Sequence, residues 1–294
     1  MKQGGGSVNM EYFVPATLSE ALSLLKKWRG KAQVVAGCTN MIPDMRSKAV
    51  KAEGLIDVSH LKNLSFIKEE KTRIRIGALT TISDMAFSKT INKYAPILSE
   101  AARELGNPLL RNRATIGGNL ADASPAADTA VPLLVLEATV VTDREGEKGR
   151  QIPIDRLFVG PNKTILKSDE MIKEVMFFKP DLGEKCAYAK LGLRNAMAIS
   201  LVSIAVLLKV EEGQCMKARI GLGAVAPTPI RAHRIEDMLI GGKITESLIR
   251  ACCQKVEREI DPITDVRASA EYRRSMASVL LRRLIQRLLS EGTR

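Results

Sequence analysis

The sequence has 294 residues, of which 45% are apolar and 27% charged, as is ordinary for a globular protein. Its net charge of +12 favours acidic partners, but only 4% of the residues are aromatic, too few for the base-stacking platforms typical of nucleic-acid binders. No apolar run is long enough to span a membrane, and residues 1–9 lack the apolar core of a signal peptide. We therefore expect a disordered leader over residues 1–9, and a cytoplasmic protein.

Two α/β units are predicted in the first part of the chain. In the smaller one, residues 10–65, a helix over 17–30 precedes short strands at 33–37 and 54–61. In the larger one, residues 66–182, we expect in chain order a strand at 72–80, helices at 82–90 and 97–105, a helix running into a strand over 131–143, and strands at 151–154 and 171–178.

A third unit, residues 183–294, has a different order of elements. Three long strands come first, at 187–193, 199–210 and 215–226, and three helices follow, at 230–240, 245–260 and 271–290. Strands followed by helices in one block predict a three-stranded antiparallel sheet with helices on one face.

The densest basic segment, residues 271–289, is predicted to be an amphipathic helix with a basic face. Its apolar residues recur at helical spacing: Met276, Val279, Leu280, Ile285, Leu288 and Leu289. Such a face is most often simply solvated; docking on an acidic partner subunit is the next interpretation, and membrane or nucleic-acid binding comes after that.

The reactive side chains point to no metal site and no nucleophile. The five cysteines show no CxxC spacing, and the two histidines stand in no catalytic motif. If the chain carries out redox chemistry, a bound organic cofactor must supply it.

Residues 114–130, ATIGGNLADASPAADTA, contain no lysine, arginine or aromatic residue. Backbone N–H groups of Gly117 and Gly118, with the side chains of Thr115 and Asn119, are suited to holding a phosphate. The small residues that follow, Ser124 among them, leave room for a bulky ligand. A glycine pair in a loop is, however, more often just a turn.

Asp128, near the end of this stretch, has two interpretations. It is either the N-cap of the following helix or an acceptor for ribose or ribityl hydroxyls.

A second glycine turn strengthens the interpretation as a nucleotide site. Residues 34–41, VVAGCTNM, form an apolar strand ending in glycine, with a hydroxyl and an amide just after it. Two such units, about eighty residues apart, can hold one diphosphate from both sides. Neither matches the Walker A loop or the GxGxxG fingerprint, so we expect another fold.

The motifs resemble those of a known family. VVAGCTNMIPDMR is similar to AGGTDLxxxMR, and RNRATIGGNLADASPAADTAVPLLVLEATV to RNxGTIGGNLxxASPAxDxxPxLLALDAxV. Further similarities are found in IPIDRLFVGPNKTIL, AYAKLGLRNAMAIS and DVRASAEYRR. The chain resembles the FAD-binding medium subunits of the molybdenum hydroxylases, such as xanthine dehydrogenase and aerobic carbon monoxide dehydrogenase, from Tyr12 to its end.

The resemblance implies an α+β fold: a two-lobed FAD-binding domain of the vanillyl-alcohol-oxidase (PCMH) type, then a three-stranded antiparallel sheet with a helical bundle. It implies non-covalent FAD, with Asp128 near the ribityl and sugar groups and Ile172 and Lys190 beside the isoalloxazine. On the residues alone, Ile172 can equally be core and Lys190 an exposed strand lysine. The implied cofactor-binding residues are Val35, Ala36, Gly37, Cys38, Thr39, Asn40, Met41, Thr115, Ile116, Gly117, Gly118, Asn119, Ser124, Asp128, Ile172 and Lys190.

Three positions depart from the family pattern. Cys38 replaces the second glycine of AGGTD, and there a left-handed backbone would cost on the order of 1 kcal/mol. Asn40 replaces the aspartate of that motif. Ala198 replaces the aspartate of FxKxxxRxAxDIS, which removes a charge near the reactive edge of the flavin and bears on the electron acceptor.

The implied function is electron transfer from the [2Fe–2S] clusters of a small partner chain, through FAD, to an acceptor such as NAD. A large molybdopterin chain would hydroxylate the substrate, in a dimer of heterotrimers. One rival interpretation is a cofactor-free scaffold subunit that has lost its site. Another is a self-sufficient flavin oxidase, which the absence of a histidine or tyrosine base near the glycine turns disfavours.

Overall fold

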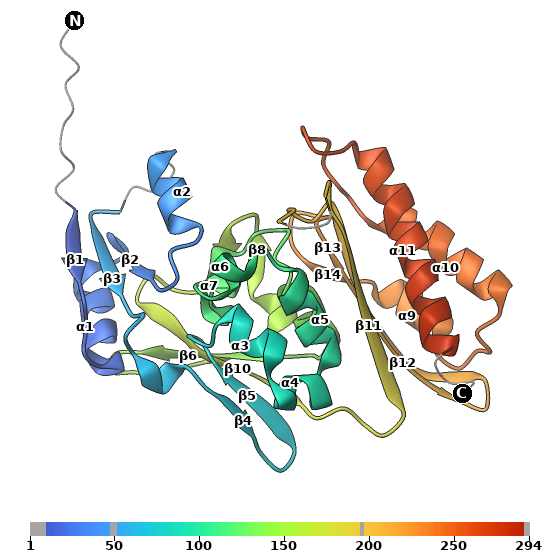
Figure 1. Cartoon of the computed structure of the whole chain (residues 1–294), viewed down its shortest axis with the longest axis horizontal. Coiled ribbons are helices and arrows are strands. Elements are labelled where there is room, and N and C mark those ends of the chain that lie inside the picture. Colours follow the sequence, from blue (N-terminus) through green and yellow to red (C-terminus); the bar gives the residue numbers. More distant parts are fainter. Residues whose placement is uncertain (1–9, 48–51, 195–196, 291–294) are drawn as a thin grey trace, which may run out of the picture.

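The computed structural model describes residues 10–47, 52–194 and 197–290. Three parts follow one another along the long axis of the molecule, in the order of the sequence (Figure 1). Helices and strands are mixed throughout, which confirms the predicted α+β class. Among the described helices, none has the combination of length and apolarity needed to cross a bilayer.

The first part is a parallel three-stranded sheet with one long helix against it. The strand order is β1-β3-β2. Its elements are β1 (Glu11–Phe13), α1 (Leu18–Trp28), β2 (Ala32–Val35), α2 (Met41–Arg46) and β3 (Gly54–Asp57). Thr17 caps α1, accepting a hydrogen bond from the Glu20 N–H, and the helix ends at Arg29 in left-handed conformation. The apolar face of α1 packs on Ile56 and Val58.

The second part is an antiparallel five-stranded sheet in the order β4-β5-β10-β6-β7, with several short helices. Its strands are β4 (Ile67–Glu69), β5 (Arg73–Gly77), β6 (Thr139–Arg144), β7 (Gln151–Pro153) and β10 (Glu170–Phe178), beside a ribbon of β8 (Phe158–Gly160) and β9 (Lys163–Thr164). Its helices are α3 (Ile82–Phe87), α4 (Lys89–Tyr94), α5 (Pro96–Glu104), α6 (Pro108–Arg111), α7 (Ile116–Asp122) and α8 (Ala130–Val135). The sheet and these helices enclose the largest core cluster.

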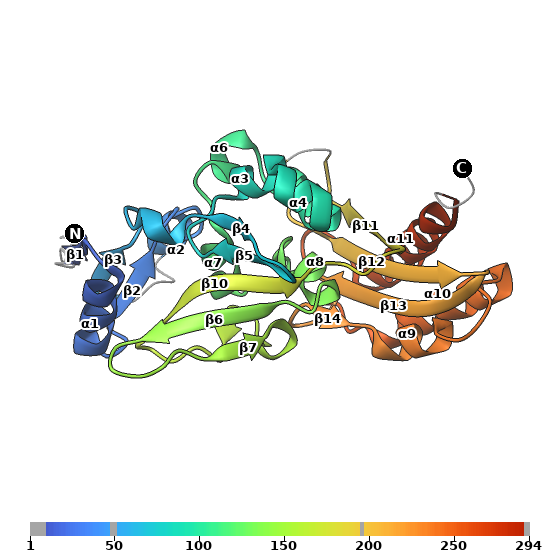
Figure 2. The same cartoon turned by 90° about the horizontal axis from the view of Figure 1, so that it is seen from below.

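The third part contains the three predicted long strands, β11 (Glu184–Leu191), β12 (Val202–Glu211) and β13 (Gln214–Gly223), all antiparallel. A two-residue strand, β14 (Ile230–Arg231), pairs with β13 and extends the sheet to four strands. The helices α9 (His233–Leu239), α10 (Glu246–Glu259) and α11 (Ala270–Ser290) lie along one face (Figure 2).

Strand β12 is buried on both faces from Val202 to Leu208, which explains why that stretch is apolar except for Ser203. Ile204 and Val206 point into the core shared with the helices of the third part. Ala205 and Leu207 belong instead to the core of the second part, with α5 and α8 against this sheet. The second and third parts are therefore joined by packed apolar side chains.

The buried row of helix α11 shares only Ile285 and Leu288 with the expected apolar row. The buried row is Arg273, Ala277, Leu281, Leu284, Ile285 and Leu288, while Met276, Leu280 and Leu289 lie partly buried at its edges. The reason is that α11 contacts β11, β12 and α10 together, so its buried face is broad. Part of its positive charge is paired within the chain, Arg282 with Glu246 and Arg287 with Glu100.

Candidate functional site

The first glycine segment runs from the end of β2 into α2. A Cβ atom at position 37 would lie 1.9 Å from the carbonyl oxygen of Arg113, so only glycine allows this approach. Cys38 then adopts a left-handed conformation, with φ of +56°. The strain expected for a non-glycine residue at position 38 is therefore present. Burial raises the pKa of the Cys38 thiol, which keeps it protonated at neutral pH.

The second glycine segment is a helix start rather than an open loop. Thr115 is the N-cap of α7, and its hydroxyl accepts a hydrogen bond from the Gly118 N–H at 3.1 Å. The Gly117 N–H donates to the Ala78 carbonyl at 2.8 Å. The prediction that both N–H groups are exposed to a ligand was therefore wrong, because capping and a neighbouring strand end engage them. A Cβ at position 117 would lie 2.8 Å from both the Cβ and the carbonyl oxygen of Ala78.

The two segments lie against each other. Besides the contact of Gly37 with Arg113, Asn40 Nδ2 donates to Asp122 Oδ2 across the junction at 2.8 Å. Asp122 is the last residue of α7, and burial raises the pKa of its carboxyl group, an effect that the hydrogen bond from Asn40 opposes. An aspartate at position 40 would face this carboxylate, which explains why the chain has asparagine there.

A cavity of about 110 Å³ lies between the first and second parts, where the glycine segments meet. Four predicted residues line it: Ala36, Gly117, Gly118 and Ile172. Ala121, one of the small residues expected to leave room for a ligand, also lines it, whereas sequence reasoning missed Val34, Val58, Leu64, Ala78, Leu79, Leu166, Glu170 and Met171. Small-molecule sites usually enclose about 300–1,000 Å³, so a dinucleotide would occupy this cavity with one part and the open surface with the rest.

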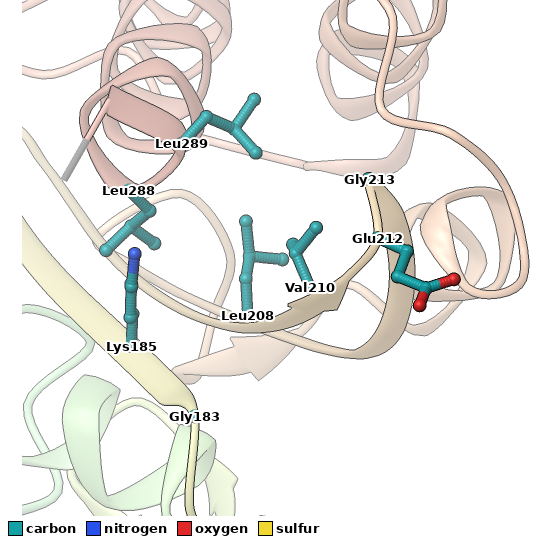
Figure 3. A pocket seen from close by; sticks show the side chains of 8 residues that line it. All are labelled: Gly183, Lys185, Leu208, Val210, Glu212, Gly213, Leu288 and Leu289. Atoms are coloured by element: carbon teal, nitrogen blue, oxygen red, sulfur yellow. The ribbon is translucent and has the colours of Figure 1, made fainter. Parts of the chain in front are cut away.

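A larger cavity, of about 440 Å³, lies in the third part and contains no predicted site residue (Figure 3). Its wall is formed by Leu208, Val210, Leu288 and Leu289, with Lys185 and Glu212 as its charged side chains. Aliphatic walls with one lysine offer little to recognise a diphosphate, so the smaller cavity is the better candidate in spite of its size.

Asp128 and Lys190 form a buried ion pair, with Lys190 Nζ 2.6 Å from Asp128 Oδ2. The side chains are only 7% and 6% exposed, so the interpretation of Lys190 as an exposed strand lysine was wrong. The alternative role of Asp128 as an N-cap was also wrong, because Thr129 precedes α8 and no side chain caps that helix. The carboxylate is instead used within a polar cluster.

Two further side chains complete the cluster, and neither was predicted. Asp128 Oδ1 accepts hydrogen bonds from Ser200 Oγ at 2.6 Å and from the Tyr188 hydroxyl at 3.2 Å. Burial, together with the nearby Asp128 charge, raises the pKa of Tyr188 well above its usual value. Ser200 and Tyr188 lie in the motif around AYAKLGLRNAMAIS, which was the one available signal for them.

The cluster is linked to the second glycine segment. Asn119 Oδ1 accepts a hydrogen bond from the Thr129 hydroxyl at 2.5 Å, next to Asp128. The Ser124 hydroxyl accepts from the Ala126 N–H. Val35 and Ile116 are core residues, and Met41 packs on the small cluster around Val35, so the side chains of these three support the turns from behind. Ile172 is both buried and part of the cavity wall.

Two family models match the chain. The model described as the FAD binding domain in molybdopterin dehydrogenase matches residues 8–178, and the one described as the CO dehydrogenase flavoprotein C-terminal domain matches residues 187–288. Among curated relatives, the nicotinate dehydrogenase FAD-subunit of Eubacterium barkeri is 30% identical, covering 96% of this chain and 97% of its own. The carbon monoxide dehydrogenase medium chain of Hydrogenophaga pseudoflava is 31% identical, covering 94% and 95%.

Solved structures agree in fold over the same length. The chain superposes on carbon monoxide dehydrogenase from Hydrogenophaga pseudoflava with a TM-score of 0.92 at 30% identity, covering 96% of this chain and 98% of that one. For quinoline 2-oxidoreductase from Pseudomonas putida the TM-score is 0.90 at 26% identity, with 97% and 98% covered. Two joined glycine segments, a cavity at their junction and matches over nearly the whole length lead to one conclusion: the chain belongs to the family of FAD-binding subunits of the molybdenum hydroxylases, a class of oxidoreductases.

Proposed function

We propose that this chain relays electrons within a molybdenum hydroxylase, receiving them on FAD from the [2Fe–2S] clusters of a partner chain and passing them to an acceptor such as NAD. The observation that supports this most is the junction of the two glycine segments, where the Asn40–Asp122 hydrogen bond joins them and Ala36, Gly117 and Gly118 form part of a cavity wall. We keep the division at residues 65 and 182 as part of the proposal.

The residues at the junction fit a dinucleotide. Ala36, Gly118 and Ala121 line the cavity and leave it open, while Thr39 and Asn40 provide polar side chains in the segment that follows Ala36. Among the residues that the structure describes, Asp128 Oδ2 accepts a hydrogen bond only from Lys190, and it keeps acceptor capacity for a sugar or ribityl hydroxyl. Lys190 holds a positive charge in a buried position, where charge interactions are stronger than in water. Bound FAD would supply the redox chemistry of the proposed relay.

We propose the same assembly for which the resemblance argues: a heterotrimer with a small [2Fe–2S] chain and a large molybdopterin chain, paired into a dimer of heterotrimers in the cytoplasm. A flavin that only relays electrons must lie close to its donor, so the chain acts inside a complex. The net charge of +12 supports association with acidic neighbours.

The first test is flavin binding. The purified chain, reconstituted with FAD, should show flavin absorbance and changed flavin fluorescence. Ala121→Trp should lower FAD affinity at least tenfold by filling the cavity, whereas Ser275→Trp, on the exposed face of α11, should leave it unchanged. A wild-type chain that leaves free-flavin absorbance and fluorescence unaltered would establish the rival interpretation, a cofactor-free scaffold.

The second test concerns the relay. Co-expression with the two expected partner chains, followed by size-exclusion chromatography, should give a complex that contains all three. A monomer that binds FAD but neither partner at low salt would rule the relay out. Steady turnover of a small alcohol or amine by the isolated chain would favour the self-sufficient oxidase instead.

A further inference from the structure

One buried cation in the third part has no role in the site described above. Arg273, in the first turns of α11, is only 2% exposed, so its guanidinium is cut off from water. Nη1 donates to the carbonyl oxygens of Leu201 at 2.7 Å and Ala224 at 3.3 Å, and Nη2 donates to Asp265 Oδ1 at 3.0 Å. One side chain thus ties together the helix, the start of β12 and the end of β13.

The contact with Leu201 leads directly to the polar cluster. Leu201 follows Ser200, whose hydroxyl donates to Asp128 Oδ1 at 2.6 Å. The Leu201 N–H donates to the Leu191 carbonyl, so Leu201, the residue after Ser200, is held through both its backbone N–H and its carbonyl. Movement of Leu201 would carry the Ser200 hydroxyl away from Asp128.

The contact with Ala224 reaches the same stretch by another route. Ala224 has a left-handed backbone, with φ of +62°, which costs a non-glycine residue about 1 kcal/mol and requires support from its surroundings. Its carbonyl accepts from Arg273, and its N–H donates to the Pro125 carbonyl at 2.8 Å. Pro125 lies three residues before Asp128 in the SPAAD sequence.

Both series of contacts that start at Arg273 therefore end within residues 125–128. Burying a guanidinium carries a desolvation cost that its partners only partly return, so stability alone explains such a residue poorly. Asp265 balances the charge, and it is itself held by the Arg267 side chain at 2.5 Å and by the Arg267 N–H at 2.9 Å. These residues lie in the closing motif DVRASAEYRR, far along the chain from the glycine segments.

We propose that Arg273 is a positioning residue for the cofactor site: through Leu201 and Ala224 it fixes Ser200 and Pro125, and through them the Asp128–Lys190 pair. The inference rests on the proposed function, since it assigns to the closing motif the task of holding the residues expected to meet FAD. The inference predicts that replacing Arg273 weakens FAD binding and shifts the flavin potential in the same direction as removing the Ser200 hydroxyl.

The matched control is Arg231, a second largely buried arginine of the same part. Its Nε is 2.7 Å from Glu236 Oε1, and Nη1 donates to the Leu134 carbonyl at the far end of α8. It joins the second and third parts directly, whereas the contacts of Arg273 stay within the third part, and the contacts of Arg231 lead away from Asp128. Arg231→Met therefore reports the effect of losing a buried arginine without disturbing the polar cluster.

The experiment compares Arg273→Met, Arg231→Met and Ser200→Ala in FAD affinity, in the reduction potential of the bound flavin, and in the urea midpoint. We expect Arg273→Met to weaken FAD binding at least tenfold and to shift the potential in the same direction as Ser200→Ala. Arg231→Met should lower the urea midpoint while changing FAD affinity less than twofold. Arg273→Lys, which keeps the charge and one donor group, should be intermediate and serves if the methionine variant does not fold.

Double variants give the decisive result. Arg273→Met with Ser200→Ala should bind FAD about as weakly as Arg273→Met alone, whereas Arg231→Met with Ser200→Ala should show the product of the separate effects. Equal effects of the two arginine variants on FAD, or independent effects of Arg273 and Ser200, would overturn the inference while leaving the proposed function intact. Failure of the wild-type chain to bind FAD would instead refute the proposed function.

Discussion

In residues 35–41 the chain turns through a left-handed residue, whereas in residues 115–119 it enters a helix. The first segment has one glycine, Gly37, and places Cys38 in the strained conformation. The second has two glycines, neither in the left-handed region, and engages their N–H groups within the protein. The two segments, both predicted from the sequence as glycine turns, thus have different local structures.

The glycines of both segments nevertheless have the same structural role, which is to allow neighbouring backbone to approach closely. The missing Cβ of Gly37 makes room for the Arg113 carbonyl, and that of Gly117 for the Ala78 carbonyl. In each case the neighbour is backbone, which cannot move aside as a flexible side chain can. The comparison teaches that these glycines bring the walls of the cleft together, while alanines and Gly118 beside them leave the space for a ligand.

The largest expected effect comes from Gly37→Ala. Its Cβ would lie 1.9 Å from the Arg113 oxygen, so the two segments must separate, and we expect a loss of about 3 kcal/mol in the free energy of unfolding. FAD binding should be lost with it. Urea unfolding and FAD titration measure both. Gly117→Ala, with contacts of 2.8 Å, should cost less.

The control for Gly37→Ala is Gly160→Ala in β8. A Cβ there would have its nearest neighbour at 4.0 Å, and its backbone is not left-handed, so the variant should be close to neutral. Equal stability losses at positions 37 and 160 would contradict the role assigned to the close approach.

The next effect concerns the hydrogen bond between the segments. Asn40→Asp places a carboxylate against Asp122, and we expect FAD affinity to fall about tenfold, or about 1.4 kcal/mol, at neutral pH. Adding Asp122→Asn reverses the donor and acceptor and should restore binding. A double variant that binds FAD no better than Asn40→Asp would show that this hydrogen bond does not hold the segments together.

A smaller effect isolates the strain at position 38. Cys38→Gly and Cys38→Ala both remove the thiol, but only glycine adopts φ of +56° without cost. We expect the glycine variant to be more stable than the alanine variant by about 1 kcal/mol, measured by urea unfolding. If alanine proves the more stable, the left-handed conformation of residue 38 is in error.

The smallest effect is a pH dependence. Burial raises the pKa of Asp122 above its unfolded value, so the folded state holds the proton more tightly. Stability contributed by the protonated group is therefore present below the unfolded pKa and lost as the pH rises through the folded pKa. Asp122→Asn should remove this decline, and its stability relative to the wild type should rise over that pH range. A constant difference between the two proteins would contradict the shift.

Local patterns predicted much of the fold. The strand–helix order of the third part and the helix after Thr17 follow from periodicity, capping and turn residues, all of which act within a few residues of one another, whereas the α+β class was implied by the family resemblance. The stretch 114–130 and the turn at Gly37 were recognised for the same reason, because a run of small residues is visible in the sequence itself. Of the cavity wall, Ala36, Gly117 and Gly118 were predicted from those runs, and Ile172 from the resemblance to the family.

The partners of these residues were decided by the tertiary structure. Asn40 meets Asp122 across 82 positions, Lys190 meets Asp128 across 62, and Ser200 meets Asp128 across 72. No periodicity reports contacts over such separations, since they depend on how sheets and helices pack. Arg273 was read as part of a basic helix, and only the packing of α11 on β12 made it a buried donor to the strands beside the site. The sequence by itself determined which residues are small, polar or charged; the fold decided which of them face one another.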